Sequence, residues 1–377
     1  PGVIPLAIPD VGEEEVALVG DAMRSGWVAY GPYVDRFESE IAELVGAKHA
    51  VGVGSGTFAL HVALLLAGVQ PDDEVLVSTL TFISPAFAIR YAGAWPVLMD
   101  AEPEYRQLDV EKLADFLREE TTRAGGELRN RKTGRRIGAI LPVGILGHPV
   151  DMDAVNELAA EYGVPVVEDG AETLGATYRD RPAGHLAPLA CLSFNGNKLI
   201  TSASGGMIVT DDDALAGRAR YLIAQAKDDP LEYVHGEIGF NYRLSNLHAA
   251  FGVGQLHRLP EFVDAKRRIA ERYEEGFADV PGIVTPREAP WAQSTFWLYT
   301  IEADESRALM RGLLDAGIQV RPLWQPLHES PALRGAQAYR CETAERLHRR
   351  GLSLPCSVSL TENDQARVID EVRRLSS

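Results

Sequence analysis

Short apolar runs alternate with helical patterns over the first two hundred residues of the chain. Runs rich in β-branched residues predict buried strands, and they lie at 50–54, 74–78, 95–100, 137–143, 164–169, 189–194 and 205–210. Apolar positions at helical spacing predict helices at 58–68, 84–93, 110–120 and 152–163, with another beginning near Asp212. Strands separated by helices are typical of βαβ units. We therefore expect an α/β/α domain around a mixed, mainly parallel sheet.

The pattern changes near residue 256. An amphipathic helix at 259–280 leads to strand-like residues at 294–303, a helix at 306–317, an apolar stretch at 318–324 and a closing helix at 362–375. We predict a large domain over residues 1–255 and a smaller C-terminal α+β domain over 256–377. The basic, glycine-containing segment 121–136 is expected to be a solvated hairpin, although a phosphate-binding role is conceivable.

Charge and cysteine content narrow the class of protein. The 377 residues include 37 Lys and Arg against 54 Asp and Glu, a net charge of −17, which repels nucleic acid and anionic membranes. Cys191, Cys341 and Cys356 are widely spaced, so we expect buried free thiols and a reducing cytoplasm. The sequence begins without a basic, signal-like region, and no apolar run reaches the length of a membrane span.

Four polar features stand out among the predicted strands. A glycine-rich turn at 52–60 lies between a strand and a helix, where backbone N–H groups bind phosphate. Asp169 ends an apolar strand, a position where ligands of open α/β sheets bind. Lys198 follows the next strand in SFNGNK, and GFNYRLSN at 239–246 precedes a helix whose cap is expected at Ser245. Taken singly, each feature is equally well explained as a tight turn, a helix cap or a surface residue.

Together the features match one cofactor. Pyridoxal 5′-phosphate has a phosphate, a pyridine nitrogen that pairs with a carboxylate, and an aldehyde that needs an amine. The turn at 52–60, Asp169 and Lys198, 29 residues further on, supply these three partners. A lysine in a partly desolvated pocket is suited to forming a Schiff base. The sequence therefore predicts a site for this cofactor.

At these residues the chain resembles the DegT/DnrJ/StrS family of sugar aminotransferases, which are pyridoxal-phosphate enzymes of the aspartate aminotransferase (type I) fold. The resemblance runs along nearly the whole sequence. Its motifs are GWVAYGPYVDRFE at 26–38, GSGT at 54–57, LTFIS at 80–84, GHPVDMD at 147–153, VEDGAETLGATY at 167–178, SFNGNKLITSASGGM at 193–207, GFNYRLSN at 239–246 and RPLWQPLH at 321–328.

The resemblance implies a role for each matching residue. Lys198 would bond the cofactor and later move a proton between carbons, and Asp169 would keep the pyridine nitrogen protonated. Gly56, Thr57 and Ser193 would bind the cofactor phosphate, Phe82 would stack on the ring, and Glu172 would lie near the ring hydroxyl. Asn241 would reach the phosphate from the other subunit of an obligatory homodimer. Arg243 is a candidate for binding the side-chain carboxylate of L-glutamate.

Within the family, the segments 226–243, 321–328 and 351–357 look most like one branch of 4-aminotransferases. That branch acts on UDP-linked 4-keto-6-deoxy-N-acetylhexosamines on routes to legionaminic acid and bacillosamine-type sugars. The implied reaction moves an amino group from L-glutamate to the C4 ketone through pyridoxamine 5′-phosphate, with Trp324 and His328 as sugar-nucleotide contacts or, equally, packing and surface residues.

Other functions stay open at this point. A GDP- or dTDP-keto-sugar aminotransferase, of the perosamine synthase kind or forming a 3-amino sugar, shares the motifs. A dehydratase of this fold would carry His in place of Lys198, and a non-catalytic sugar or cofactor sensor would be expected to lose Lys198 or Asp169.

The sequence departs from the usual family pattern at three places. Glu172 stands where many members have Gln or His, so a neutral partner near the cofactor becomes ionisable. Gly144 stands where relatives often have His, and Ala203-Ser204 lies in a loop that is usually richer in glycine.

Overall fold

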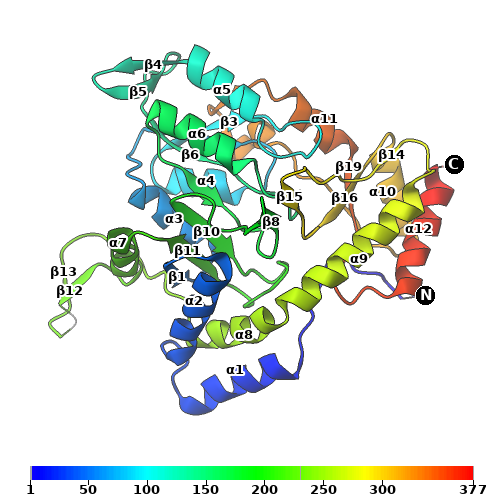
Figure 1. Ribbon diagram of the computed structural model, residues 1–377, viewed down its shortest axis with the longest axis horizontal. Helices are drawn as coiled ribbons and strands as arrows, with labels where there is room; N and C mark the ends of the chain where they lie inside the picture. The colour runs from blue at the N-terminus through cyan, green and yellow to red at the C-terminus, as the bar shows by residue number, and fades with distance from the viewer. Residues whose placement is uncertain (1, 230, 377) are drawn as a thin grey trace.

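An eight-stranded sheet forms the centre of the large part of the protein, in a computed structural model that describes residues 2–229 and 231–376 (Figure 1). Its strands, in spatial order, are β1 (His49–Val53), β11 (Gly206–Thr210), β10 (Leu189–Ser193), β7 (Val167–Asp169), β6 (Ile137–Leu141), β2 (Glu74–Ser78), β3 (Trp95–Met99) and β18 (Gln337–Tyr339). The bridges Ile140–Val166 and Val143–Asp169 join its two halves. Only β11 is antiparallel to its neighbours β1 and β10, which confirms the predicted mixed, mainly parallel sheet.

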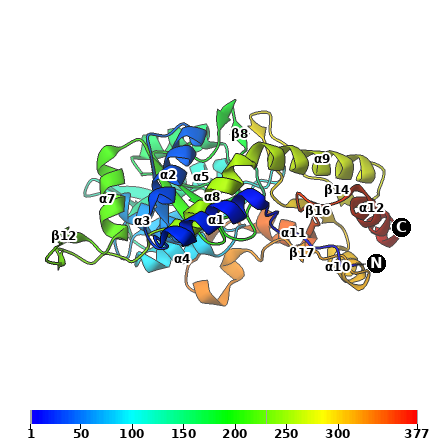
Figure 2. The same ribbon diagram turned by 90° about the horizontal axis from the view of Figure 1, so that it is seen from below.

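Helices cover both faces of this sheet, as predicted for an α/β/α arrangement (Figures 1 and 2). One face is covered by α3 (Gly56–Leu66), α4 (Ser84–Tyr91) and α7 (Asp213–Ile223). The other is covered by α5 (Val110–Glu119) and α6 (Met152–Tyr162) over one half, and by α2 (Pro32–Val45) and α8 (Asn246–His257) over the other. Helix α1 (Glu13–Ser25) lies along α8; the sequence pattern did not lead us to predict α1 or α2.

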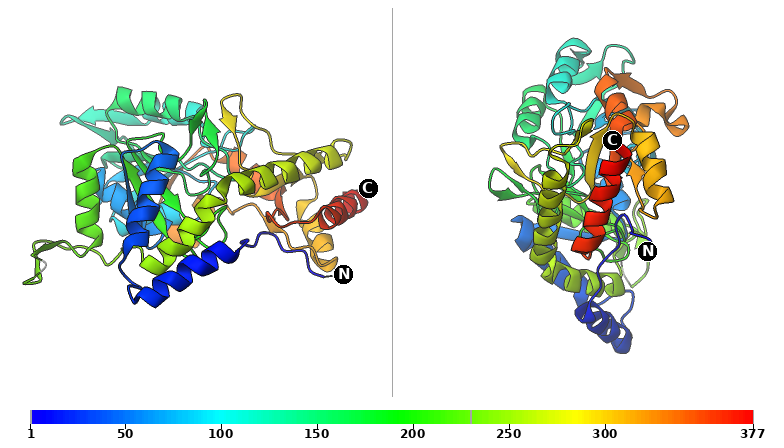
Figure 3. Two further views of the ribbon diagram at one scale, coloured as in Figure 1. Left: turned by 60° about the horizontal axis from the view of Figure 1, so that its bottom comes forward. Right: turned by 90° about the vertical axis from the view of Figure 1, so that its right-hand side faces the viewer.

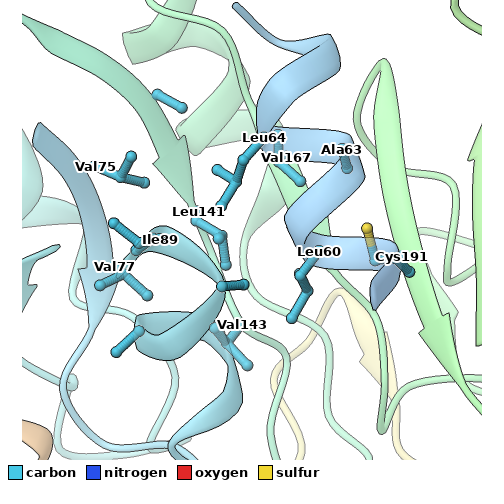
Figure 4. Close-up of a cluster of buried hydrophobic side chains, with 14 of the residues drawn as sticks. Leu60, Ala63, Leu64, Val75, Val77, Ile89, Leu141, Val143, Val167 and Cys191 are labelled. Atoms are coloured by element: carbon cyan, nitrogen blue, oxygen red, sulfur yellow. The ribbon is translucent and has the colours of Figure 1, made fainter. Parts of the chain in front are cut away.

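The alternation of side chains along the strands divides the core between the two faces. Val75 and Val77 point to the α3 side, whereas Leu76 between them packs with α5 and α6. Figure 4 shows how side chains from α3, α4 and neighbouring strands fill the α3 side, including Leu60, Ile89 and Cys191. All three cysteines are buried and free, as expected from their spacing.

The C-terminal part is built around a second sheet. Its strands are β14 (Ile283–Val284), β16 (Tyr299–Ala303), β19 (Gly351–Leu354) and β17 (Arg321–Pro322), packed with α9 (Leu259–Phe277), α10 (Ser306–Asp315) and α12 (Glu362–Ser376). The strand-like segment 294–303 is a strand only at β16, and the apolar stretch 318–324 contains the two-residue strand β17. Phe296 and Trp297 lie instead in the connection that precedes β16, where the N–H of Thr295 donates to the carbonyl of Gly147 at 3.1 Å.

The chain returns to the large sheet near its end. The short helices η1 (Leu327–Glu329) and η2 (Pro331–Leu333), strand β18 and α11 (Glu342–Arg350) pack on or pair with the large sheet. The predicted domain boundary after residue 255 falls near the end of α8, and the division into two domains stays a prediction. In the right-hand view of Figure 3, the two chain ends lie at the C-terminal part.

Smaller hairpins complete the fold. The pair β4 (Thr121–Ala124) and β5 (Glu127–Asn130) is the predicted hairpin, and β8 (Thr177–Tyr178), β9 (Arg181–Pro182) and β15 (Ala292–Gln293) form a small sheet. The pair β12 (Lys227–Asp229) and β13 (Val234–His235) projects from the body in Figures 1 to 3. Among the described residues, no helix is both long and apolar enough to span a membrane.

Candidate active site

A cavity of about 610 Å³ lies at the carboxyl ends of five strands, β1, β2, β6, β7 and β10. In open α/β sheets this edge is where ligands bind, because the loops leaving neighbouring strands diverge there. The C-terminal sheet closes the other side with residues of β17 and β19. The cavity brings together most of the residues that the sequence singled out, namely Gly56, Thr57, Phe82, Asp169, Glu172, Ser193, Lys198 and Trp324.

Asp169 is the last residue of β7 and is only 3% exposed. Burial raises the pKa of its carboxyl to about 6, and the nearby Glu172 also raises it, while the N–H of Ala171 and the Lys198 ammonium oppose the shift. The Ala171 N–H donates to Oδ1 at 3.0 Å. A buried carboxylate with so little compensation is suited to a cationic partner, such as a protonated ring nitrogen.

Lys198 reaches the same end of the cavity from the turn after β10. Its Nζ lies 3.1 Å from Oε1 of Glu172 and 4.2 Å from the ring centroid of Trp297. The other carboxylate oxygen of Glu172 accepts the N–H of Leu146 at 2.9 Å. Trp297 was not identified from the sequence, since nothing in STFWLYT distinguishes an indole in the site from one in the core.

The turn after β1 forms a cradle at the start of α3. Ser55 caps the helix, its hydroxyl accepting the N–H of Phe58 at 3.2 Å, while the N–H groups of Gly56 and Thr57 belong to the first turn, which has no intrahelical acceptor. Glycine is required here, because a Cβ at position 56 would lie 2.8 Å from Cβ and 3.0 Å from Oγ of Ser193. Backbone N–H groups, a helix N-terminus and the Ser193 hydroxyl together fit a phosphate.

Phe82 borders this cavity from the loop between β2 and α4. Its side chain is largely exposed, at 54%, which leaves a ring face open to a planar ligand. The carboxylate, the amine, the phosphate cradle and the aromatic ring therefore fit the parts of pyridoxal 5′-phosphate.

Comparison with known proteins agrees with this fit. The profile of the DegT/DnrJ/EryC1/StrS aminotransferase family matches residues 9–373. The chain belongs to this family. It is thus a pyridoxal-phosphate-dependent sugar aminotransferase of fold type I.

Individual relatives cover nearly the whole chain. GDP-perosamine synthase of Caulobacter vibrioides is 38% identical over 97% of this chain and 96% of its own, and EpsN of Bacillus subtilis is 37% identical over 98% and 95%. The crystal structure of DesV of S. venezuelae in complex with a ketimine intermediate has a TM-score of 0.90 at 32% identity, covering 100% of this chain and 99% of that one.

Two family-motif residues lie outside the cavity of their own chain. Asn241 accepts a hydrogen bond from Nε2 of Gln225 at 3.0 Å, close to the projecting hairpin. Arg243 places its guanidinium 4.2 Å from the ring centroid of Tyr30, in a separate hollow of about 270 Å³. Neither residue therefore lines the cavity that holds Lys198 in the same chain.

The motif RPLWQPLH divides between the cavity and the core. Trp324 lines the cavity, and so does Arg321, which the sequence analysis did not single out. His328 instead lies in contact with Oγ1 of Thr79 at 2.9 Å and Oε1 of Glu345 at 3.2 Å. A sugar-nucleotide contact for His328 stays a prediction, and its observed partners are protein groups.

The departures from the family pattern have physical explanations. At Gly144 a Cβ would lie 2.4 Å from Cγ2 of Thr173, so the space of a larger residue is filled by that methyl group. Ala203 has a left-handed backbone with φ of 64°, a conformation that favours glycine. Ser204 lines the cavity and donates its hydroxyl to the carbonyl of Gly54 at 2.7 Å.

Proposed function

We propose that this aminotransferase moves an amino group from L-glutamate to the C4 ketone of a nucleotide-linked 4-keto-6-deoxy sugar, with UDP-2-acetamido-2,6-dideoxy-4-hexulose as the favoured acceptor. The observation that carries the proposal is the joint presence of Lys198, Asp169 and the Gly56 cradle in one cavity. The cavity also has two indoles, Trp297 and Trp324, beyond those groups. Indole faces are well suited to packing against the apolar side of a sugar ring.

The residues divide the chemical work between them. The bound cofactor supplies an aldehyde that accepts the amino group and a ring that withdraws electrons from the neighbouring carbon. Asp169 holds negative charge against the ring nitrogen, and Lys198 carries the proton that moves between carbons at its Nζ. Glu172 fixes that Nζ at 3.1 Å while the Leu146 N–H fixes Glu172.

A GDP-linked sugar is the second candidate acceptor. Three relatives that are 32–38% identical to this chain are GDP-perosamine synthases, whereas support for UDP comes from the resemblance of segments 226–243, 321–328 and 351–357 to the UDP branch. A panel of UDP-, GDP- and dTDP-linked 4-keto sugars, assayed with glutamate for 2-oxoglutarate release, separates the candidates. NMR of the product identifies the aminated carbon, and a product aminated at C3 would contradict the proposal.

Lys198→Ala tests the assigned amine directly. We expect the purified wild-type protein to be coloured by the cofactor and to lose its visible absorbance when glutamate is added. The variant should lack that absorbance and all measurable turnover, because no other lysine lines the cavity among the described residues. Turnover by a folded Lys198→Ala variant would refute the assignment.

We also propose that Asn241 and Arg243 serve the cavity of a partner subunit in a homodimer. Both lie outside their own cavity, and the adjoining hairpin presents apolar side chains to solvent, with Leu231 85%, Tyr233 70% and Ile238 87% exposed. Exposed apolar surface of this kind is typical of protein interfaces. The proposal accounts for the exposure of these apolar side chains, which a partner subunit would cover.

Mixed dimers test this arrangement. Lys198→Ala and Asn241→Ala chains are each expected to be inactive alone, yet a hybrid dimer contains one site with both Lys198 and Asn241 intact. Co-refolded mixtures should therefore recover activity, up to about a quarter of wild type for random pairing of equal amounts. No recovery in a mixture shown to contain hybrids would mean that Asn241 acts within its own chain.

A further inference from the structure

Lys198 is held between two side chains, of which only Glu172 belongs to a recognised motif. On one side Glu172 Oε1 lies 3.1 Å from Nζ, and on the other the centroid of the Trp297 ring lies 4.2 Å from it. The Lys198 side chain is 15% exposed. A cation over an indole face is stabilised more when it is shielded from water. The low exposure of Lys198 therefore strengthens its contact with Trp297.

Trp297 is tied to the lysine-bearing turn as well as to the C-terminal part. Its Nε1–H donates to the carbonyl of Asn197, the residue before Lys198, at 2.7 Å. Its own carbonyl accepts from Nζ of Lys266 at 2.8 Å, and Lys266 is 4% exposed. Because both its indole and its backbone are anchored, the Trp297 ring cannot turn away from Lys198 without breaking the part-buried hydrogen bond to Asn197.

The backbone around Trp297 is held in an uncommon conformation. Phe296 has φ of 48°, in the left-handed region that aromatic residues rarely adopt. The segment packs against Gly147, where a Cβ would lie 2.6 Å from the N of Trp297, and the N–H of Thr295 donates to the Gly147 carbonyl at 3.1 Å. Strain of this kind persists only where surrounding contacts over-determine it.

The same contact holds the other partner of Lys198. Leu146, which precedes Gly147, has φ of 61° and donates its N–H to Oε2 of Glu172 at 2.9 Å. The contact between two loops therefore fixes both Glu172 and Trp297; the loops are residues 146–147 and 295–297. The two groups that flank the amine are positioned as a unit.

We propose that Trp297 is a positioning residue for Lys198, whose indole face and the Glu172 carboxylate hold the amine at the end of the cavity whenever it is not bonded to the cofactor. The inference rests on the proposed function, since Lys198 must be released as an amine to move a proton between carbons. A four-carbon side chain without such contacts samples many rotamers. Trp297 restricts Nζ to the region from which it can reach a substrate carbon.

The first test uses cofactor-free protein and compares Trp297→Phe and Trp297→Leu with wild type. Lys198 is acetylated with a small amine-reactive ester at fixed pH, and its labelling rate is read by peptide mass. We expect the rate to rise about 5- to 30-fold in Trp297→Leu, the equivalent of a contact worth about 1–2 kcal/mol, and about threefold in Trp297→Phe, which keeps a weaker ring contact. Trp291→Leu is the matched control, because its ring packs against Tyr105 with centroids 5.4 Å apart.

The second test measures single turnover with glutamate in the loaded enzyme. Loss of positioning should lower the rate at saturating glutamate in the order Trp, Phe, Leu and leave the glutamate concentration for half-maximal rate unchanged. Unchanged labelling of Lys198 in folded Trp297 variants would overturn the proposal. A change only in the glutamate concentration for half-maximal rate would also overturn it, because that result indicates a contact with the substrate. If Trp297→Leu does not fold, Trp297→Phe decides. A wild type without glutamate-dependent colour loss refutes the proposed function instead.

Discussion

Replacing Asp169 with Asn should stabilise the cofactor-free protein while abolishing turnover. Burial raises the pKa of Asp169 from 3.8 to about 6, a gap of about two units. At about 1.4 kcal/mol per unit, the ionised carboxylate costs ~3 kcal/mol of folding free energy once the pH exceeds both values. The side chain is only 3% exposed, so solvent does little to relieve this cost.

The direction of the pH dependence follows from proton uptake. Between about pH 4 and pH 6 the folded protein keeps the Asp169 proton that the unfolded chain has released, so the free energy of unfolding falls as pH rises through this window. The asparagine of the variant has no charge to desolvate, and its carbonyl oxygen can still accept the Ala171 N–H that Oδ1 accepts at 3.0 Å. The stability gain of Asp169→Asn should thus grow from near zero at about pH 4 to about 3 kcal/mol at about pH 7.5.

Denaturant unfolding of the cofactor-free protein, followed by tryptophan fluorescence at several pH values, measures this difference. For a chain of 377 residues the gain corresponds to roughly 4 °C in Tm. Turnover should disappear in the same variant, because a neutral amide cannot balance a protonated ring nitrogen. An Asp169→Asn protein that is no more stable than wild type at about pH 7.5 would refute the reasoning.

A buried carboxylate on the same strand provides the matched control. Burial raises the pKa of Glu168 to about 7, with backbone N–H groups of Leu186 and Gly184 opposing the shift, and Leu186 N donates to it at 2.6 Å. Glu168→Gln should therefore show its stability gain at higher pH than Asp169→Asn. Glu168 does not line the cavity, so the visible absorbance of the cofactor should be retained.

Two glycine-related changes test the cradle and the loop after Lys198. Gly56→Ala places a Cβ 2.8 Å from Ser193 Cβ. The forced shift costs about 1–3 kcal/mol and should weaken cofactor binding roughly 5- to 150-fold in a fluorescence titration. Unchanged affinity would mean that the phosphate binds elsewhere. Ala203 has a left-handed φ of 64°, which glycine adopts without strain. Ala203→Gly should therefore raise the free energy of unfolding by about 0.5–1 kcal/mol, after the greater backbone entropy of unfolded glycine is subtracted. A loss of stability would show that Ala203 is not strained.

The parts of the fold that were predictable depend on local patterns. Strand β2 occupies the predicted residues 74–78, because a β-branched run between turn residues is readable within a few positions. Ser245 caps α8 as expected, its hydroxyl accepting the His248 N–H at 3.3 Å. Lys198 and Asp169 could be placed in one cavity because the carboxyl ends of parallel strands meet at one edge.

The unpredicted parts depend on contacts between distant segments. Trp297 reaches Lys198 only because Phe296 adopts a left-handed backbone against Gly147, and no local signal in the sequence specifies that conformation for an aromatic residue. Strand β18 has three residues, too few for a periodic pattern, and is defined by its pairing with β3. In both cases tertiary packing outweighs local propensity.

Because the protein carries a net negative charge, anionic ligands must be bound by contacts that act at short range. The cofactor phosphate and the proposed substrates, a nucleotide sugar and glutamate, are anions that approach a chain of net charge −17, a field that opposes them. Within the cavity the acidic residues Asp169 and Glu172 equal the basic residues Lys198 and Arg321 in number, and Lys198 is already paired. Among the described lining residues, Arg321 is left without a carboxylate partner. Within a single chain, anion binding therefore rests on the cradle at Gly56 and the Arg321 guanidinium, and the proposed homodimer would add Arg243 of the partner subunit. These contacts act over distances shorter than the roughly 10 Å over which 0.1 M salt screens the opposing field.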